Sequence, residues 1–202
     1  MVAFYLIKLL ISVSLILIIE SVFSINNDSA KNFSETYNPI IVLIFGALLI
    51  PLIEETVFRL SIIFKPVFLS ISMGLLTLYL FSKFLNVGIL KIDETIYYRY
   101  AISLIVGVYT LYISKKHQVI IIQFWEKNFR WVFYFSAIAF GFAHYSNFDL
   151  GLSTLILIPI ITLPHTIGGI FFGYIRIKHG FIFALCFHCV NNMISLSLGL
   201  LL

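Results

Sequence analysis

The chain has 202 residues, of which 61% are hydrophobic and only 11% are charged. A soluble domain carries about a quarter charged residues, so this composition excludes a soluble globular protein and predicts an all-α polytopic membrane protein that contacts a lipid bilayer. We attribute the formal net charge of +4 to basic residues in cytoplasmic loops, and we expect no nucleic-acid partner.

Seven segments are apolar and approach the roughly 20 residues that a membrane-spanning helix needs. They lie at 3–24, 38–64, 66–83, 97–114, 130–147, 151–175 and 180–201. The sequence therefore predicts about seven transmembrane helices.

The first segment has a second interpretation, which the sequence leaves open. Lys8 would be the basic region of a cleaved signal peptide, and Val22-Phe23-Ser24 would be a weak processing site. In either case the polar loop around residues 26–29 separates an N-terminal helix and loop at 1–36 from one larger domain at 37–202.

Basic residues predict the orientation of the chain, because cytoplasmic loops are enriched in lysine and arginine. A cytoplasmic N-terminus places eight of them inside and four outside. The eight are Lys8, Lys65, Lys115, Lys116, Lys127, Arg130, Arg176 and Lys178, and the four are Lys31, Lys83, Lys91 and Arg99. We expect a multi-pass integral membrane protein, in the cell membrane if the source is bacterial, with residues 119–130 forming an interfacial helix.

The second predicted span carries Glu54, Glu55 and Arg59, although charges inside a membrane are costly. Residues four apart share one face of a helix, so Glu55 and Arg59 are expected to form an ion pair. Glu54 points elsewhere, over Phe58, and has to find its partners on other helices. A carboxylate in that position suits a general base, whereas helix packing alone also explains the ion pair.

The fifth and seventh predicted spans each contain a histidine that is four residues from an aromatic or amide side chain. Phe140 and His144 share a face of the fifth span, beside Gly141, which would admit a neighbouring helix. His188 and Asn192 share a face of the seventh span and can both donate hydrogen bonds toward one point, as an oxyanion hole requires. A simple hydrogen bond to a backbone carbonyl would explain His144 equally well.

The sixth span contains several residues of open role. Pro164 predicts a kink, and Gly169 and Gly173 predict the close approach of another helix. His165 is a candidate for a supporting or substrate-contacting residue. In the seventh span, the pair Cys186 and Cys189 would indicate redox chemistry or zinc binding in a soluble protein, but inside an apolar helix cysteine is usually a small buried side chain.

Three motifs follow one another along the chain: E-E-x-x-x-R at 54–59, F-x-x-x-H at 140–144 and H-x-x-x-N at 188–192. Together they resemble the CPBP family, which contains the CAAX proteases and bacteriocin-processing enzymes and is also called Abi. Its members are multi-spanning endopeptidases, so the resemblance implies an active site inside the helix bundle and a CPBP-like protease domain at 37–202.

The resemblance also implies a role for each motif residue. Glu54 corresponds to the catalytic glutamate, with His144 helping it to activate water. His188 and Asn192 correspond to the pair that stabilises the tetrahedral oxyanion. The residues implied to support the site are Glu55, Arg59 and Phe140.

One feature departs from the family pattern. Glu54 and His144 are 90 positions apart (54 to 144), whereas the family usually separates these motifs by a few tens of residues. The excess, at about 66–114, is interpreted as two additional spans, which keep the flanking helices in their original orientation.

We therefore expect an intramembrane endopeptidase that acts on a prenylated CAAX-type tail or on a bacterial leader or signal peptide. No cofactor is certain, because Glu54, His144 and His188 are also ligand types for zinc; we favour metal-independent chemistry. A non-catalytic immunity or scaffolding protein with the same fold is the alternative, and a proton-relaying transporter is less favoured because no inverted repeat is present. The substrate and the oligomeric state stay open.

Overall fold

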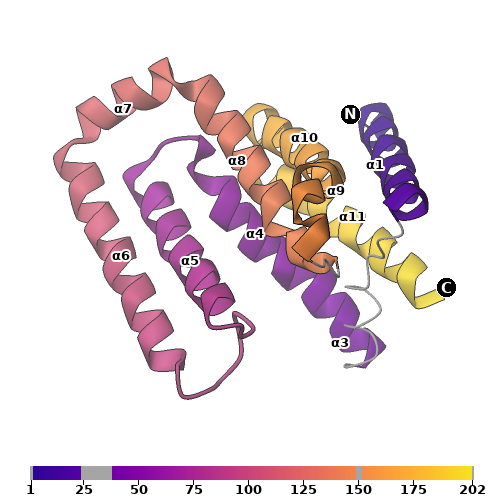
Figure 1. Ribbon diagram of the computed structural model, residues 1–202. Helices are drawn as coiled ribbons and strands as arrows, with labels where there is room; N and C mark the ends of the chain where they lie inside the picture. Colours follow the sequence, from indigo (N-terminus) through magenta and orange to yellow (C-terminus); the bar gives the residue numbers. More distant parts are fainter. Residues whose placement is uncertain (1, 24–37, 149–151, 202) are drawn as a thin grey trace. The chain divides into compact units, whose positions relative to one another are not determined.

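The structure, a computed structural model, describes residues 2–23, 38–148 and 152–201 (Figure 1). All regular elements in these ranges are helices, which confirms the predicted all-α class. The polar loop at 26–29, Ser24 of the processing site and the domain boundary at 36–37 lie outside these ranges. The chain forms two compact units, unit 1 (Met1–Leu52 and Phe133–Leu202) and unit 2 (Ile53–Val132).

Five of the seven predicted spans are helices long and apolar enough to cross a membrane, counted over the described ranges only. They are Val2–Phe23, Ile40–Ile62, Pro66–Phe84, Ile96–Lys116 and Leu155–His179. The remaining two predicted spans are shorter: α8 has 15 residues, and the apolar part of α11 covers Phe181–Ser197. With five such helices, the chain is a polytopic integral membrane protein.

Unit 1 contains the N-terminal helix and the C-terminal part of the chain. Its elements are α1 (Val2–Phe23), α3 (Pro39–Ile44), the π-helical turn η1 (Phe45–Leu49), most of α8 (Phe129–Ala143), η3 (Tyr145–Asn147), η4 (Leu152–Leu157), α9 (Ile158–Ile161), α10 (Leu163–His179) and α11 (Phe181–Leu201). A buried aromatic and aliphatic cluster joins α1, α10 and α11. Its members are Tyr5, Phe171, Phe172, Ile175 and Ala184.

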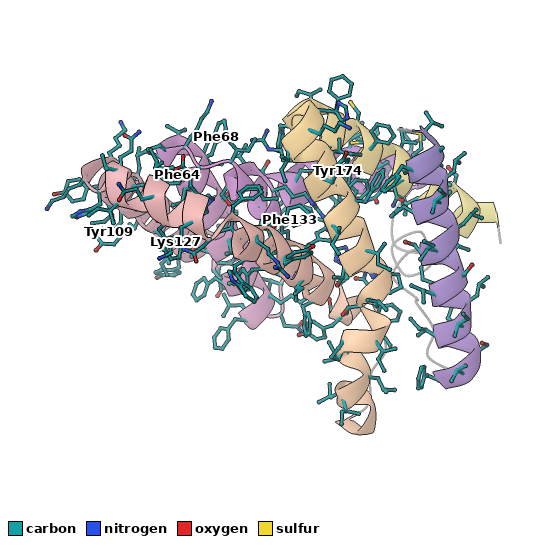
Figure 2. All side chains as sticks on the ribbon, turned by 90° about the horizontal axis from the view of Figure 1, so that it is seen from above. Phe64, Phe68, Tyr109, Lys127, Phe133 and Tyr174 are labelled. Atoms are coloured by element: carbon teal, nitrogen blue, oxygen red, sulfur yellow. The ribbon has the colours of Figure 1, made fainter. Side chains whose placement is uncertain are left out.

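Glycines bring α8 and α10 together, as the sequence predicts. A Cβ atom on Gly169 would lie 2.8 Å from the carbonyl oxygen of Ala137. A Cβ atom on Gly173 would lie 2.8 Å from the ring of Phe133, which Figure 2 labels. Both distances are too short for a side chain, so a larger residue at position 169 would push the helices apart, and one at position 173 would displace the ring of Phe133.

The predicted kink at Pro164 is present as a break between two helices. α9 ends at Ile161 and α10 begins at Leu163, with Pro164 in its first turn. Proline is tolerated there because its missing N–H would have no partner within the helix. The break places His165 in the first turn of α10.

The second predicted span is less regular than expected. Asn38 caps α3, since its Oδ1 accepts a hydrogen bond from the N–H of Ile40 at 2.9 Å. The π-helical turn η1 then interrupts the span before α4 (Ile50–Phe58), and the short η2 (Leu60–Ile62) ends it. Such π turns insert one extra residue and recur at functional sites.

Unit 2 is built on the antiparallel pair α5 (Pro66–Phe84) and α6 (Ile96–Lys116), followed by α7 (Gln118–Lys127). A Cβ atom on Gly74 would lie 3.2 Å from the carbonyl oxygen of Ser103, and the hydroxyl of Ser70 donates to the carbonyl of Gly107 at 2.8 Å. Small residues thus let the two backbones approach closely. The two spans predicted at 66–83 and 97–114 are the helices of this hairpin, and that they are additional to the family pattern stays a prediction.

Arg99 organises the loop between α5 and α6. Its side chain is fully buried, and its guanidinium donates to the carbonyl of Lys91 at 2.6 Å, to the hydroxyl of Ser82 at 3.0 Å and to the carboxylate of Asp93 at 3.2 Å. A hydrogen bond from the Thr95 hydroxyl, reinforced by the Thr95 N–H and by Arg99, lowers the pKa of Asp93. The loop is therefore held by a charged network.

Candidate active site

His144 lies just beyond the last residue of α8, and its ring is fixed by the preceding turn. The fifth span was predicted at 130–147 and was expected to hold Phe140 and His144 on one helix, but α8 ends at Ala143. The two residues nevertheless stay in contact, because His144 Nδ1 is 2.8 Å from the carbonyl oxygen of Phe140. A carbonyl oxygen can only accept, so Nδ1 carries the proton and Nε2 is the acceptor nitrogen of the neutral ring.

His165 stacks against His144. The two ring centroids are 4.3 Å apart and the rings are inclined by 22°. The Nδ1 atom of His165 is buried without a hydrogen-bond partner, and the ring of Phe148 approaches His165 edge-on at 6.2 Å. His165, left open by the sequence, thus belongs to the same cluster as His144.

His188 lies on α11 between two aromatic rings and is 2% exposed. Phe172 of α10 stacks on it at a centroid distance of 4.6 Å, and Phe140 of α8 meets it edge-on at 5.7 Å. Phe140 therefore contacts both His144 and His188, at 4.5 Å and 5.7 Å. Within unit 1 the structure brings together His144, His165 and His188, which come from three different segments.

Asn192 follows His188 by one helical turn, and its amide has a backbone partner. Asn192 Nδ2 donates to the carbonyl of Gly46, in the π-helical turn η1, at 3.1 Å. An amide nitrogen carries two hydrogens, and this bond uses one of them. A Cβ atom on Gly46 would lie 2.6 Å from a methyl carbon of Leu196, so the glycine lets α11 approach the turn.

Lys8 also belongs to this region, although from the sequence we used it only to predict orientation and as the basic region of a signal peptide. Its side chain is buried in unit 1, its Nζ donates to Oδ1 of Asn191 at 2.7 Å, and it lies 5.2 Å from the centroid of Phe172. Phe172 therefore contacts Lys8 and His188. The available signal was a lysine inside the apolar segment 3–24, since a charge at that depth requires a partner in another helix.

Glu54, Glu55 and Arg59 lie in unit 2. The predicted ion pair is present: Arg59 donates to Glu55 at 2.7 Å, and both side chains are almost completely buried. The backbone N–H of Arg59 still donates to the carbonyl of Glu55 at 2.9 Å, although α4 ends at Phe58. Glu54 is half-buried on α4. That Glu54 acts together with the histidines stays a prediction.

The zinc alternative stays a prediction, because Glu54 lies in unit 2 whereas His144 and His188 lie in unit 1. Within each unit, over the described ranges, no three His, Cys, Asp or Glu side chains gather closely enough to hold a metal ion. His144 directs Nδ1 to a backbone carbonyl, an arrangement that metal-binding histidines also adopt, and the ring of His188 lies between two phenyl groups. Cys186 is exposed and Cys189 is half-buried on α11.

The structure defines an integral membrane protein with a buried histidine, His188, in unit 1 and a buried carboxylate–guanidinium pair, Glu55 and Arg59, in unit 2. The family model described as "Type II CAAX prenyl endopeptidase Rce1-like" matches residues 36–194. This range covers most of the chain and all three motifs, so the protein belongs to this family and is a CAAX-type intramembrane endopeptidase in general terms. No curated protein and no solved structure matches the chain.

Proposed function

We propose that the protein hydrolyses a peptide bond of a membrane-associated substrate by metal-independent activation of water, with Glu54 as the general base. The observation that carries the proposal is the family match over residues 36–194, which contains Glu54, His144, His188 and Asn192 in the order of the family motifs. The geometry within unit 1 supports it, because His144 and His188 both contact Phe140.

The proposed reaction uses each side chain for one task. Glu54 removes a proton from water while the oxygen of that water forms a bond to the scissile carbonyl carbon. His144, whose Nδ1–H is directed to the Phe140 carbonyl, presents Nε2 to the same water and orients it. The proton held by Glu54 then passes to the leaving amine as the carbon–nitrogen bond breaks.

The oxyanion of the tetrahedral intermediate requires hydrogen-bond donors aimed at its position. We assign this task to His188 and Asn192. The bond from Asn192 to Gly46 holds the amide in one orientation and leaves its second hydrogen for the oxyanion. The stacked Phe172 and the edge of Phe140 hold the ring of His188 in the same way.

The substrate is proposed to be a short peptide segment that a lipid or an apolar helix delivers to the bilayer, either a prenylated CAAX-type tail or a bacterial leader or signal peptide. The description of the matching family favours the prenylated tail. An anchor of this kind concentrates the scissile bond at the depth of the membrane-spanning helices, so little further binding energy is needed to position it.

The test is cleavage by the purified full-length protein in proteoliposomes. The substrates are a farnesylated fluorogenic peptide ending in a CAAX tetrapeptide, the same peptide without the lipid, and a bacterial leader peptide. We expect cleavage by the wild type and a loss of about 10² to 10⁴ in kcat for Glu54→Gln. Glu126→Gln, an exposed acid on α7, is the matched control and should cleave normally.

Wild-type activity in the Glu54→Gln variant would overturn the assignment of the general base. Absence of cleavage by the wild type with every substrate in the panel would favour the non-catalytic immunity or scaffolding role instead.

A further inference from the structure

One end of unit 2 carries a charged surface that the proposed hydrolysis does not use. Lys65 immediately precedes α5, and Lys115 and Lys116 lie in the last turn of α6. Because α5 and α6 form an antiparallel hairpin, the start of α5 and the end of α6 lie at the same end of unit 2.

Helix α7 is fixed to this same end. The indole N–H of Trp125 donates to the carbonyl of Ile62 at 3.2 Å, and its ring centroid lies 5.5 Å from that of Phe64. Ile62 and Phe64 directly precede Lys65 in the chain, so the C-terminal half of α7 lies beside the start of α5. Figure 2, which shows the molecule from the side where α7 lies in Figure 1, labels Phe64, Phe68 and Lys127.

The resulting surface is strongly basic. We call it the α7 surface and define it by helix α7 and five exposed cations, Lys65, Lys115, Lys116, Lys127 and Arg130. Glu126 is the one carboxylate within residues 95–132. The other loop acids of unit 2, Asp93 and Glu94, lie at the opposite end of the hairpin.

The α7 surface is also apolar, which distinguishes it from a solvated charged face. No residue of α7 is buried, and the exposed fractions of Val119, Ile120 and Phe124 are 68%, 65% and 57%. Lys116 and Lys127 lie one turn before and after these apolar residues. A short helix with exposed apolar side chains and flanking cations is typical of one that lies in the membrane interface.

Two of the cations extend over aromatic rings. Lys65 Nζ lies 5.0 Å from the ring centroid of Phe68, and Lys116 Nζ lies 5.7 Å from that of Tyr112. Long basic side chains behave in this way when their stems cover apolar surface and their charges reach the headgroup layer.

We propose that the α7 surface binds the anionic headgroups of phospholipids in the membrane that holds the protein. The five cations match phosphate groups, while Val119, Ile120 and Phe124 match the upper acyl chains. A soluble polyanion would satisfy only the charges and would leave the apolar residues in water. This end is also the one predicted to be cytoplasmic, where anionic lipids are enriched.

The chain carries its own probes for the test. Its two tryptophans, Trp125 and Trp131, lie on and directly after the α7 surface. Full-length protein is reconstituted in phosphatidylcholine vesicles that contain about 30% phosphatidylglycerol, with bromine on the upper acyl chain of one lipid or the other. Bromine quenches nearby indole fluorescence, so the ratio of quenching by the two brominated lipids reports which lipid occupies the surface.

We expect brominated phosphatidylglycerol to quench the wild type more strongly, with an apparent preference of about fivefold, roughly the contribution of one basic residue near an anionic surface. The preference should fall toward one in Lys115→Gln/Lys116→Gln/Lys127→Gln/Arg130→Gln, and in the wild type as salt rises from about 0.05 M to 0.5 M. The matched control is Lys83→Gln/Lys91→Gln, at the other end of the same hairpin, which should keep the preference.

Quenching of the wild type in proportion to the mole fractions of the two lipids would overturn the proposal. So would a preference that persists in the fourfold variant, or one that is lost in the control variant as well. If the fourfold variant does not insert, the test is the salt dependence of the wild type. A preference for phosphatidylglycerol that does not fall as salt rises would overturn the proposal. None of these measurements depends on peptidase activity.

Discussion

Arg59 donates a hydrogen bond of 2.7 Å to Glu55, one helical turn earlier, and both side chains are almost fully removed from solvent. A buried ion pair is weak evidence for stability, because the cost of removing two charges from water can exceed their attraction. Removal of only one partner is different, since the remaining buried charge then loses its nearest counter-charge.

This relationship predicts the effects of single and double replacements. Glu55→Gln and Arg59→Met should each lower the free energy of unfolding by about 3–5 kcal/mol. The double variant Glu55→Leu/Arg59→Met should recover most of the loss, because both charges are then absent. Thermal unfolding of the detergent-solubilised protein measures this. A double variant that is less stable than either single variant would contradict the expectation.

His165 is predicted to act by holding the ring of His144 in position. His165→Phe keeps a flat ring against His144 and should leave kcat within about threefold of the wild type. His165→Leu removes the ring, and a misplaced imidazole should lower kcat by about tenfold or more with little change in KM. His179→Leu, on the exposed end of the same helix, is the control. Equal effects of the Phe and Leu replacements would show that stacking is not the cause.

The chemistry is predicted to be independent of metal ions. Treatment of the active proteoliposomes with a strong zinc chelator should leave the cleavage rate unchanged, because the proposed reaction activates water with the Glu54 carboxylate and the His144 imidazole alone. Metal content is measured on the same preparation. Activity that disappears with chelator and returns with zinc would refute this prediction.

Asp93 predicts a pH dependence for the loop between α5 and α6. Its pKa is lowered in the folded protein, chiefly by the hydrogen bond from Thr95, so its contribution to stability is present above its unfolded pKa of about 3.9 and is lost as the pH falls through the folded value. Hydrogen exchange of the loop amides should therefore accelerate below about pH 4. Asp93→Asn should accelerate hydrogen exchange of the loop at pH 7 and should abolish the further acceleration below about pH 4. If the variant keeps that acceleration, another titrating group is its cause.

Local periodicity was sufficient for several of these features. The spacing of Glu55 and Arg59 predicted their ion pair, because residues four apart meet on any helix. Apolar segments of suitable length predicted the five long helices. The glycines at 169 and 173 predicted the close approach of a neighbouring helix, because the absence of a Cβ atom is a property of the residue itself.

The sequence did not predict where helices are interrupted or where they end. The second span was predicted as one continuous helix, yet a π-helical turn interrupts it where the Gly46 carbonyl binds Asn192. The fifth span was predicted to continue past His144, but α8 ends at Ala143. Helix ends and single inserted residues depend on hydrogen bonds to groups that are distant in the sequence. The periodicity of apolar residues does not reveal such hydrogen bonds.

The amino-acid sequence alone thus determined that the chain is a helical membrane protein, which motifs it contains and which neighbours pair within one helix. Only the tertiary structure decided that His165 stacks on His144, that Phe140 contacts His144 and His188, and that Lys8 reaches Asn191, 183 positions further along the chain. The physical reason is distance along the chain: a contact between helices depends on how whole helices rotate and approach, and that is settled by many side chains at once.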